Sequence, residues 1–173
     1  AMDRISSEYV LGMLEDSSGQ FWISFYVGPL IRFDKKSGTI AGLFPTEAES
    51  IVSIVEDPDD PRTLWLGTHM MGIAKFDKTS GTYTYYPPDP ESPHKGAGAT
   101  YCQTVVCDRD EPSIWFGGTY GGGLGKFDKK TERFTRYIND PNNPHSISSN
   151  SLATICQDRR GRIWIGTKGG GLN

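Results

Sequence analysis

The sequence predicts an all-β protein, a β-propeller fragment of about three and a half four-stranded antiparallel blades. Three observations lead to this prediction. A tryptophan-centred motif recurs along the 173 residues, glycines and aromatic residues are frequent, and no segment of helical length shows a helical period. Hydrophobic residues make up only 36% of the chain, whereas aromatic residues reach 12% and glycine occurs 21 times. Such a balance is typical of short strands joined by tight turns.

The repeat is set by tryptophans at positions 22, 65, 115 and 164, which are 43, 50 and 49 residues apart. The tripeptide Phe-Asp-Lys follows the first three tryptophans after 11 or 12 residues. The chain therefore holds three full repeats and about half of a fourth. We expect blades at 3–50, 51–100 and 101–150 and the first half of a fourth at 151–173, with 1–2 interpreted as a cloning remnant.

Each repeat is expected to supply four strands. An apolar run comes first, a tight turn leads to the tryptophan strand, a glycine-rich turn leads to a third strand, and a polar turn leads to the fourth. Examples of the four, in that order, are IVSIVED, RIWIGT, GLGKFD and TYTYYP (51–57, 162–167, 123–128 and 82–87). Four strands in about 43–50 residues match the size of a propeller blade.

The motif D-x-x-G-x-[IF]-W-[IL]-G-T-x-x-G-G-[IL]-x-[KR]-[FY]-D, repeated in register, resembles the repeat of two-component regulator propellers. The linker NDPNNPHSISSN at 139–150 is similar to the linkers of that family. The first repeat departs from the motif with WISFYV at 22–27, and the second inserts PDDPR at 58–62. The resemblance implies a fragment of an extracytoplasmic bacterial sensor region that recognises extracellular carbohydrate.

Several recurrent residues are predicted to be structural. An Asp before each Trp should open a turn and accept backbone N–H groups, and two glycines should supply a positive φ there. Metal binding or catalysis by these carboxylates is the alternative, but one per blade would be too far apart to share an ion. The predicted turn residues are Asp16, Asp57, Asp108, Asp158, Gly19 and Gly161. The predicted core residues are Trp22, Trp65, Trp115, Trp164, Phe33, Phe76 and Phe127.

Other recurrent groups are also interpreted structurally. Glycine clusters at 121–123 and 169–171 are predicted to be turns, since the alternative, a phosphate-binding loop, needs a following helix. Asp34, Asp77 and Asp128, each followed by Lys, are expected to be solvated turn residues. The cysteines at 102, 107 and 156 lack metal-ligand spacing and should be small buried hydrophobes, with a disulfide or reactive thiol as the alternative.

Function is expected where the repeats differ, on the face that gathers the turn after the second strand and the linkers between blades. Aromatic rings can pack against the C–H face of a sugar while polar groups bind its hydroxyls. The candidate ligand-binding residues are Tyr26, His69, Met70, Met71, Tyr120, Lys168, His94, Tyr101, Asn143 and His145.

The remaining expectations concern partners and chemistry. A net charge of −3 does not favour nucleic acid, and no apolar run suggests membrane contact by this chain. No signal peptide, cofactor or metal site is evident, and no catalytic motif marks an enzyme. A protein-interaction module and a fragment of a glycosidase or lyase remain the alternatives. Because incomplete blades expose strand edges and apolar faces, we expect the chain to self-associate.

Overall fold

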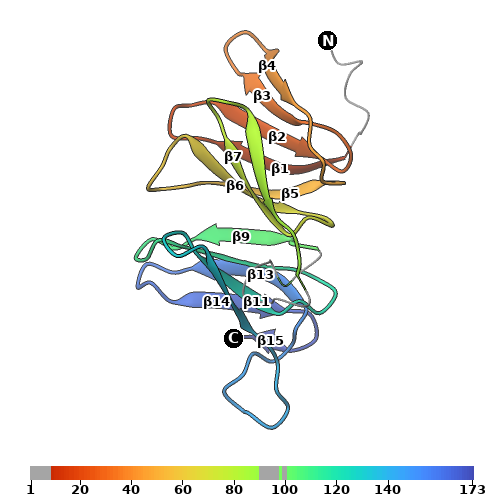
Figure 1. The fold of residues 1–173 in the computed structure, drawn as a ribbon, viewed down its shortest axis with the longest axis vertical. Coiled ribbons are helices and arrows are strands. Elements are labelled where there is room, and N and C mark those ends of the chain that lie inside the picture. Colours follow the sequence, from red (N-terminus) through yellow and green to blue (C-terminus); the bar gives the residue numbers. More distant parts are fainter. Residues whose placement is uncertain (1–8, 90–97, 99–100) are drawn as a thin grey trace.

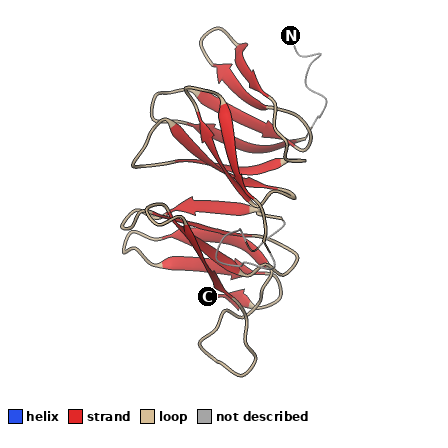
Figure 2. Ribbon diagram, in the orientation of Figure 1, coloured by secondary structure: helices blue, strands red, loops and turns tan. Residues whose placement is uncertain are grey.

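The computed structural model describes residues 9–89, 98 and 101–173, which form fifteen strands and no helix. Accordingly, nothing among these residues is a helix long and apolar enough to cross a membrane. The strands form four antiparallel sheets stacked one after another along the chain (Figures 1 and 2).

Each sheet is built from consecutive strands. The first contains β1 (Val10–Glu15), β2 (Phe21–Phe25), β3 (Leu30–Asp34) and β4 (Thr39–Phe44). The second contains β5 (Ile51–Glu56), β6 (Thr63–Thr68), β7 (Ile73–Asp77) and β8 (Thr82–Tyr86). The third contains β9 (Thr104–Cys107), β10 (Ser113–Gly117), β11 (Leu124–Asp128) and β12 (Arg133–Tyr137). The last contains β13 (Leu152–Gln157), β14 (Ile163–Thr167) and β15 (Gly171–Leu172).

The sheets are arranged as propeller blades. Within each sheet the strands follow chain order, and the first strands of successive sheets, β1, β5, β9 and β13, contact one another. After every fourth strand the chain therefore returns to the side where the first strands contact one another, and there it starts the next blade. The predicted fold class is confirmed, with strands within about a residue of those expected from the sequence.

The core lies between the sheets, where a tryptophan of one blade meets a phenylalanine of the next. The centroid of the Trp22 ring is 5.6 Å from that of Phe76, and the Trp65 ring is 5.4 Å from Phe127. All four side chains are at most 2% exposed. Burial of each such ring contributes roughly 1.5–3 kcal/mol or more, so these contacts are a main source of stability.

Three residues predicted to be core are only partly buried: Phe33, Trp115 and Trp164. Phe33 and Trp164 belong to the first and fourth sheets, and each lies on the face directed away from the other three sheets. Trp115 faces the fourth sheet, whose third strand, β15, contributes two residues to the described structure. The repeat pattern identified the position of each ring but not the presence of a neighbour.

The cysteines also differ from the prediction. All three are free, but only Cys102 is fully buried, while Cys107 is partly buried and Cys156 is exposed. Burial raises the pKa of both Cys102 and Cys107 to about 12, so these thiols are unreactive at neutral pH. Cys156 is exposed because it lies on the outer face of the fourth sheet beside Trp164, its cross-strand partner.

Candidate functional site

One edge of every blade carries the same turn, opened by the repeated aspartate. The Asp16 carboxylate accepts hydrogen bonds from the backbone N–H groups of Ser18 and Gln20, at 3.0 and 2.9 Å. Gly19 and Gly161 have φ values of +78° and +79° in the turns of the first and fourth sheets. These residues therefore lie at the turns where the sequence placed them.

The aspartates have a second role that the sequence did not reveal. In all four repeats the carboxylate accepts the indole N–H of the following tryptophan, at 2.8–3.0 Å. The carboxylate thus fixes the orientation of the tryptophan ring. In the first two blades this ring packs against the next blade, and we call such a contact between successive blades a junction. The pairs are Asp16–Trp22, Asp57–Trp65, Asp108–Trp115 and Asp158–Trp164.

The lysine of the Phe-Asp-Lys tripeptide has a role in the second and third blades that the sequence did not reveal. Lys78 binds Asp16 of the preceding blade and Glu56 of its own, both at 2.7 Å, and its side chain is 12% exposed. Lys129 binds Asp57 and Asp59, both of the preceding blade and both at 2.7 Å. These ion pairs join successive blades at the edge that carries the turns.

The ion pairs also set the protonation states of this edge. Burial alone would raise the pKa of Asp57, but hydrogen bonds from Lys129 and Trp65 prevail and hold it below its ordinary value. The same opposition, with Trp115 and Gln157 among the donors, lowers the pKa of Asp108. Both carboxylates are therefore ionised at neutral pH.

A polar hollow of about 540 Å³ lies between the turns of the second and third blades and is lined by Asp57, Asp108, Arg109 and Lys129, among others. A glycosidase needs one carboxyl group with a raised pKa to act as a general acid. Here the buried carboxylates of Asp57 and Asp108 have lowered pKa values; Asp57 is bound by Lys129 and Trp65, and Asp108 by Trp115 and Gln157. Across the described residues, moreover, no cluster of acidic, histidine and cysteine side chains is suited to a metal ion.

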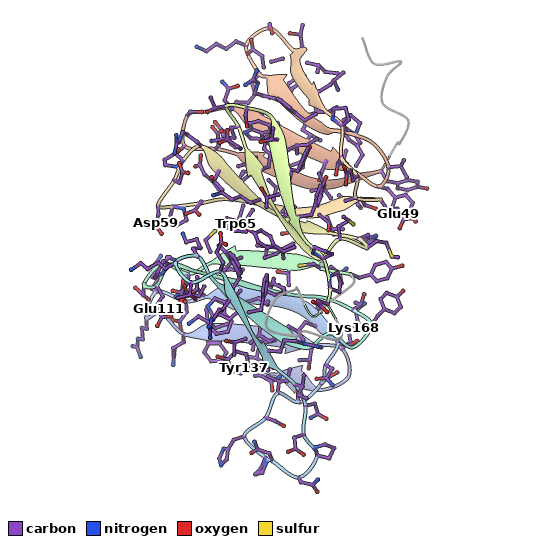
Figure 3. The ribbon with its side chains drawn as sticks, in the orientation of Figure 1. Glu49, Asp59, Trp65, Glu111, Tyr137 and Lys168 are labelled. Carbon is purple, nitrogen blue, oxygen red and sulfur yellow. The ribbon has the colours of Figure 1, made fainter. Side chains whose placement is uncertain are left out.

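The opposite edge of the blades gathers the variable segments. Glu49 lies at this edge, whereas Asp59 and Glu111 lie at the edge that carries the repeated turns (Figure 3). Backbone hydrogen bonds join each variable turn to a neighbouring linker: His69 N–H donates to Ser50 at 3.0 Å, and Lys168 N–H donates to Ser151 at 2.8 Å. The turn after the second strand and the linker therefore form one surface, which we call the loop edge.

Three aromatic side chains meet on the loop edge. The ring of Tyr101 lies between those of His69 and Tyr120, with centroid distances of 4.7 and 4.8 Å. His69 and Tyr101 also form an isolated antiparallel bridge, which holds the linker against the turn of the second blade. A row of three rings contributed by two blades therefore lies on this surface.

Two residues with large side chains, at the tips of these turns, have a left-handed backbone conformation. Met70 has φ +71° and Tyr120 has φ +74°, and their side chains are 50% and 80% exposed. The matching residue in the fourth sheet is Gly169, with φ +85°. A left-handed conformation costs a residue with a Cβ roughly 1–2 kcal/mol, and such strain concentrates at functional sites. Both residues therefore combine a strained backbone with an exposed side chain.

The surroundings of His69 favour a neutral ring. Burial lowers the pKa of His69 below its ordinary value, and the charge of Glu49 opposes this shift without reversing it. Its Nδ1 lies 3.4 Å from the Ser50 hydroxyl. A neutral imidazole offers one donor and one acceptor, which suits hydroxyl groups.

A glycine permits the approach of the Tyr101 segment. A Cβ on Gly118 would lie 1.7 Å from the carbonyl oxygen of Tyr101, so no larger residue fits without movement of the linker. Gly118 is therefore part of the site, although its sequence position alone did not mark it as different from the neighbouring turn glycines.

The segment between β12 and β13 projects from the third blade as a long loop (Figure 1), and it carries Asn143 and His145. Together with Trp115, Tyr137 and neighbouring residues they line a hollow of about 490 Å³. At the two preceding junctions, the ring of the matching tryptophan packs on Phe76 or Phe127. The hollow therefore lies beside Trp115, at the position that a phenylalanine fills in the two preceding contacts between blades.

Of the other candidates, Tyr26 and Lys168 belong to separate turns, and Met71 shares the turn of His69 and Met70. Tyr26 is 46% exposed beyond β2, Met71 is partly buried beside Met70, and Lys168 is exposed between β14 and β15. His94 lies outside the described residues. Sequence reasoning missed a mostly apolar hollow of about 540 Å³ lined by Val27, Pro29, Leu43 and Ala48, among others. Pro29 and Pro45, which both line the hollow, lie in variable segments and were a signal that the sequence offered.

Comparison with known proteins is consistent with the resemblance noted in the sequence. Residues 146–169 match the family model described as a two-component regulator propeller, which confirms the resemblance over that repeat. A histidine kinase P4 from Formosa agariphila is 32% identical over 57 residues, covering 33% of this chain and 4% of that protein. The chain thus spans a small part of this curated relative.

Solved structures share the fold over nearly the whole chain. The extracellular domain of a putative hybrid two-component system from B. thetaiotaomicron superimposes with a TM-score of 0.78 and 18% identity, covering 97% of this chain and 21% of that one. A second such domain from the same organism gives 0.79 and 20%, covering 99% and 24%. The chain therefore matches about a fifth to a quarter of these larger propeller proteins.

Proposed function

We propose that this chain is part of the extracytoplasmic sensor propeller of a bacterial two-component regulator, and that its loop edge binds carbohydrate without chemical conversion. The observation that carries the proposal is the row of rings formed by His69, Tyr101 and Tyr120. The matched propeller repeat and the hybrid two-component systems among the similar structures support the sensor role.

The chemistry of the ring row suits a sugar. Exposed tyrosine rings offer flat apolar faces for the C–H groups of a pyranose, and the hydroxyls of Tyr101 and Tyr120 can bond its hydroxyl groups. The neutral imidazole of His69 adds a donor and an acceptor without introducing a charge. Rings from two blades with fixed spacing could contact neighbouring sugar units of an oligosaccharide.

A non-catalytic role is supported by the opposite edge. Asp16, Asp57 and Asp108 are engaged by indole and basic or amide groups, and their pKa values are lowered. None of the three is therefore suited to donate a proton to a glycosidic oxygen at neutral pH.

The test is a screen of plant and host oligosaccharides on a glycan array, followed by calorimetry with the best ligand. We expect Tyr120→Ala to weaken binding about tenfold, because it removes one ring contact. Lys130→Ala, in the turn between β11 and β12, is the control and should bind normally. Binding that survives both Tyr120→Ala and Tyr101→Ala would contradict the proposed site, and shortened oligosaccharide products would reveal an enzyme.

A further inference from the structure

The ring row has a charged neighbour, the carboxylate of Glu49. Ser50, which is fully buried, holds His69 by two contacts: its carbonyl oxygen accepts the His69 N–H at 3.0 Å, and its hydroxyl lies 3.4 Å from Nδ1 of the ring. Glu49 directly precedes Ser50, is exposed and lies at the loop edge (Figure 3). Its negative charge acts on the imidazole, where it opposes the lowering of the His69 pKa by burial. An exposed carboxylate therefore lies near the His69 end of the row, on a backbone that Ser50 anchors.

The described part of the loop edge carries more negative than positive charge. Arg136 of β12 reaches this edge, but its guanidinium group is partly buried and donates to the carbonyl oxygen of Gly122 at 2.8 Å. The charged residues in the described turns and linkers are four carboxylates and one ammonium group, Glu47, Glu49, Asp89, Asp140 and Lys168. A ligand at the ring row therefore meets a surface that attracts positive charge and repels negative charge.

We propose that Glu49 sets the charge preference of the ring row, which favours hexosamine units with a free ammonium group and disfavours uronic acids. This inference rests on the proposed function, because it concerns the ligand of the same site. An ammonium group on a pyranose is attracted by the carboxylate of Glu49 and by the negative faces of the tyrosine rings. The carboxylate of a uronic acid is repelled by Glu49 and gains nothing from the ring faces.

Three tetrasaccharides that share the linkage of cellulose test this preference: one of glucose, one of glucosamine and one of glucuronic acid. Calorimetry measures their affinities for the unchanged chain, for Glu49→Gln and for Glu49→Lys, in mildly acidic buffer of low ionic strength. The Glu49 side chain is exposed, so neither substitution removes core packing. Glu132→Gln, which removes one exposed carboxylate from the turn between β11 and β12, is the matched control.

The unchanged chain should bind the glucosamine tetramer about two- to fivefold more tightly than the glucose tetramer, because exposed charge pairs have effects of this size. It should bind the glucuronic acid tetramer more weakly than the glucose tetramer by a similar factor. Glu49→Gln should remove most of both differences, Glu49→Lys should reverse them, and Glu132→Gln should retain them. A higher salt concentration should reduce the differences, since it screens exposed charges.

Three results would overturn the inference. They are equal affinities of the unchanged chain for the three tetramers or tightest binding of the glucuronic acid tetramer, differences that persist in Glu49→Gln, and binding of none of the three. The last result by itself leaves the proposed function standing, because the glycan array tests other sugars. An array without any ligand would contradict the proposed function as well.

Discussion

The two edges of the blades use the repeated sequence in opposite ways. At the edge with the repeated turns, Asp57 binds Trp65 and receives Lys129 from the next blade, and the side chains involved are almost completely buried. At the loop edge, Tyr120 is 80% exposed and has a strained backbone. Residues that recur therefore join blades, whereas those that differ are held outward, where they contribute little to stability.

The strongest test of this contrast is truncation of a ring in a junction. Trp65→Ala should lower the free energy of unfolding by about 3–5 kcal/mol, because it leaves a cavity against Phe127. Urea denaturation measures the loss. Tyr120→Ala, on the loop edge, is the comparison and should change the free energy by no more than about 0.5 kcal/mol. Similar losses for both variants would remove the distinction between the edges.

A second test addresses the ion pair between blades. Asp57→Asn should destabilise the fold by about 1–3 kcal/mol, because it removes one of the two carboxylates, those of Asp57 and Asp59, that bind the ammonium group of Lys129. The matched change at the outer blade, Asp158→Asn, should cost much less, since Arg162 is more than half exposed. Chemical denaturation of both variants gives the comparison, and equal losses would show that burial of the lysine is unimportant.

Acid should weaken the edge with the repeated turns before it affects the loop edge. Burial opposes ionisation of Asp16, but Lys78, Ser18 and Trp22 outweigh it and lower its pKa below 3.8, the ordinary value. A lowered folded-state pKa contributes stability above the unfolded value, and that stability is lost as pH falls through the folded value. The melting temperature should therefore be steady near neutral pH and fall below about pH 4.

The pH effect has its own control. Asp57→Asn removes one of the carboxylates with a lowered pKa, so the variant should lose less stability between pH 7 and pH 3 than the unchanged chain. An unchanged acid dependence in this variant would mean that other carboxylates are responsible.

The smallest expected effect is a gain in stability at the loop edge. Met70→Gly relieves a left-handed backbone and should stabilise the fold by up to about 1 kcal/mol. Gly169→Ala introduces the same strain at the matching turn and should destabilise it by about 1 kcal/mol. Denaturation curves of both variants test whether the loop edge stores strain, and a destabilised Met70→Gly variant would contradict it.

Much of the architecture could be predicted because the same pattern recurs in four repeats, so that each repeat supports the interpretation of the others. Four tryptophans in register identified the blades, and the strands and turns followed from short-range patterns. The partners of Asp16 and Lys78 could not be predicted, because their contacts lie between residues 62 positions apart in the chain. The exposure of Trp164 was also missed, because the same motif is buried or exposed according to the neighbour that it meets.

The sequence by itself determined the strand order, the turns with Gly19 and Gly161, and the surface on which the variable segments lie, since these depend on local backbone preferences and alternating strand direction. Tertiary structure decided that Tyr101 lies between His69 and Tyr120 and that Lys129 reaches Asp57. These contacts depend on how far one blade is rotated from the next. That rotation is a property of packed sheets, which no single repeat encodes.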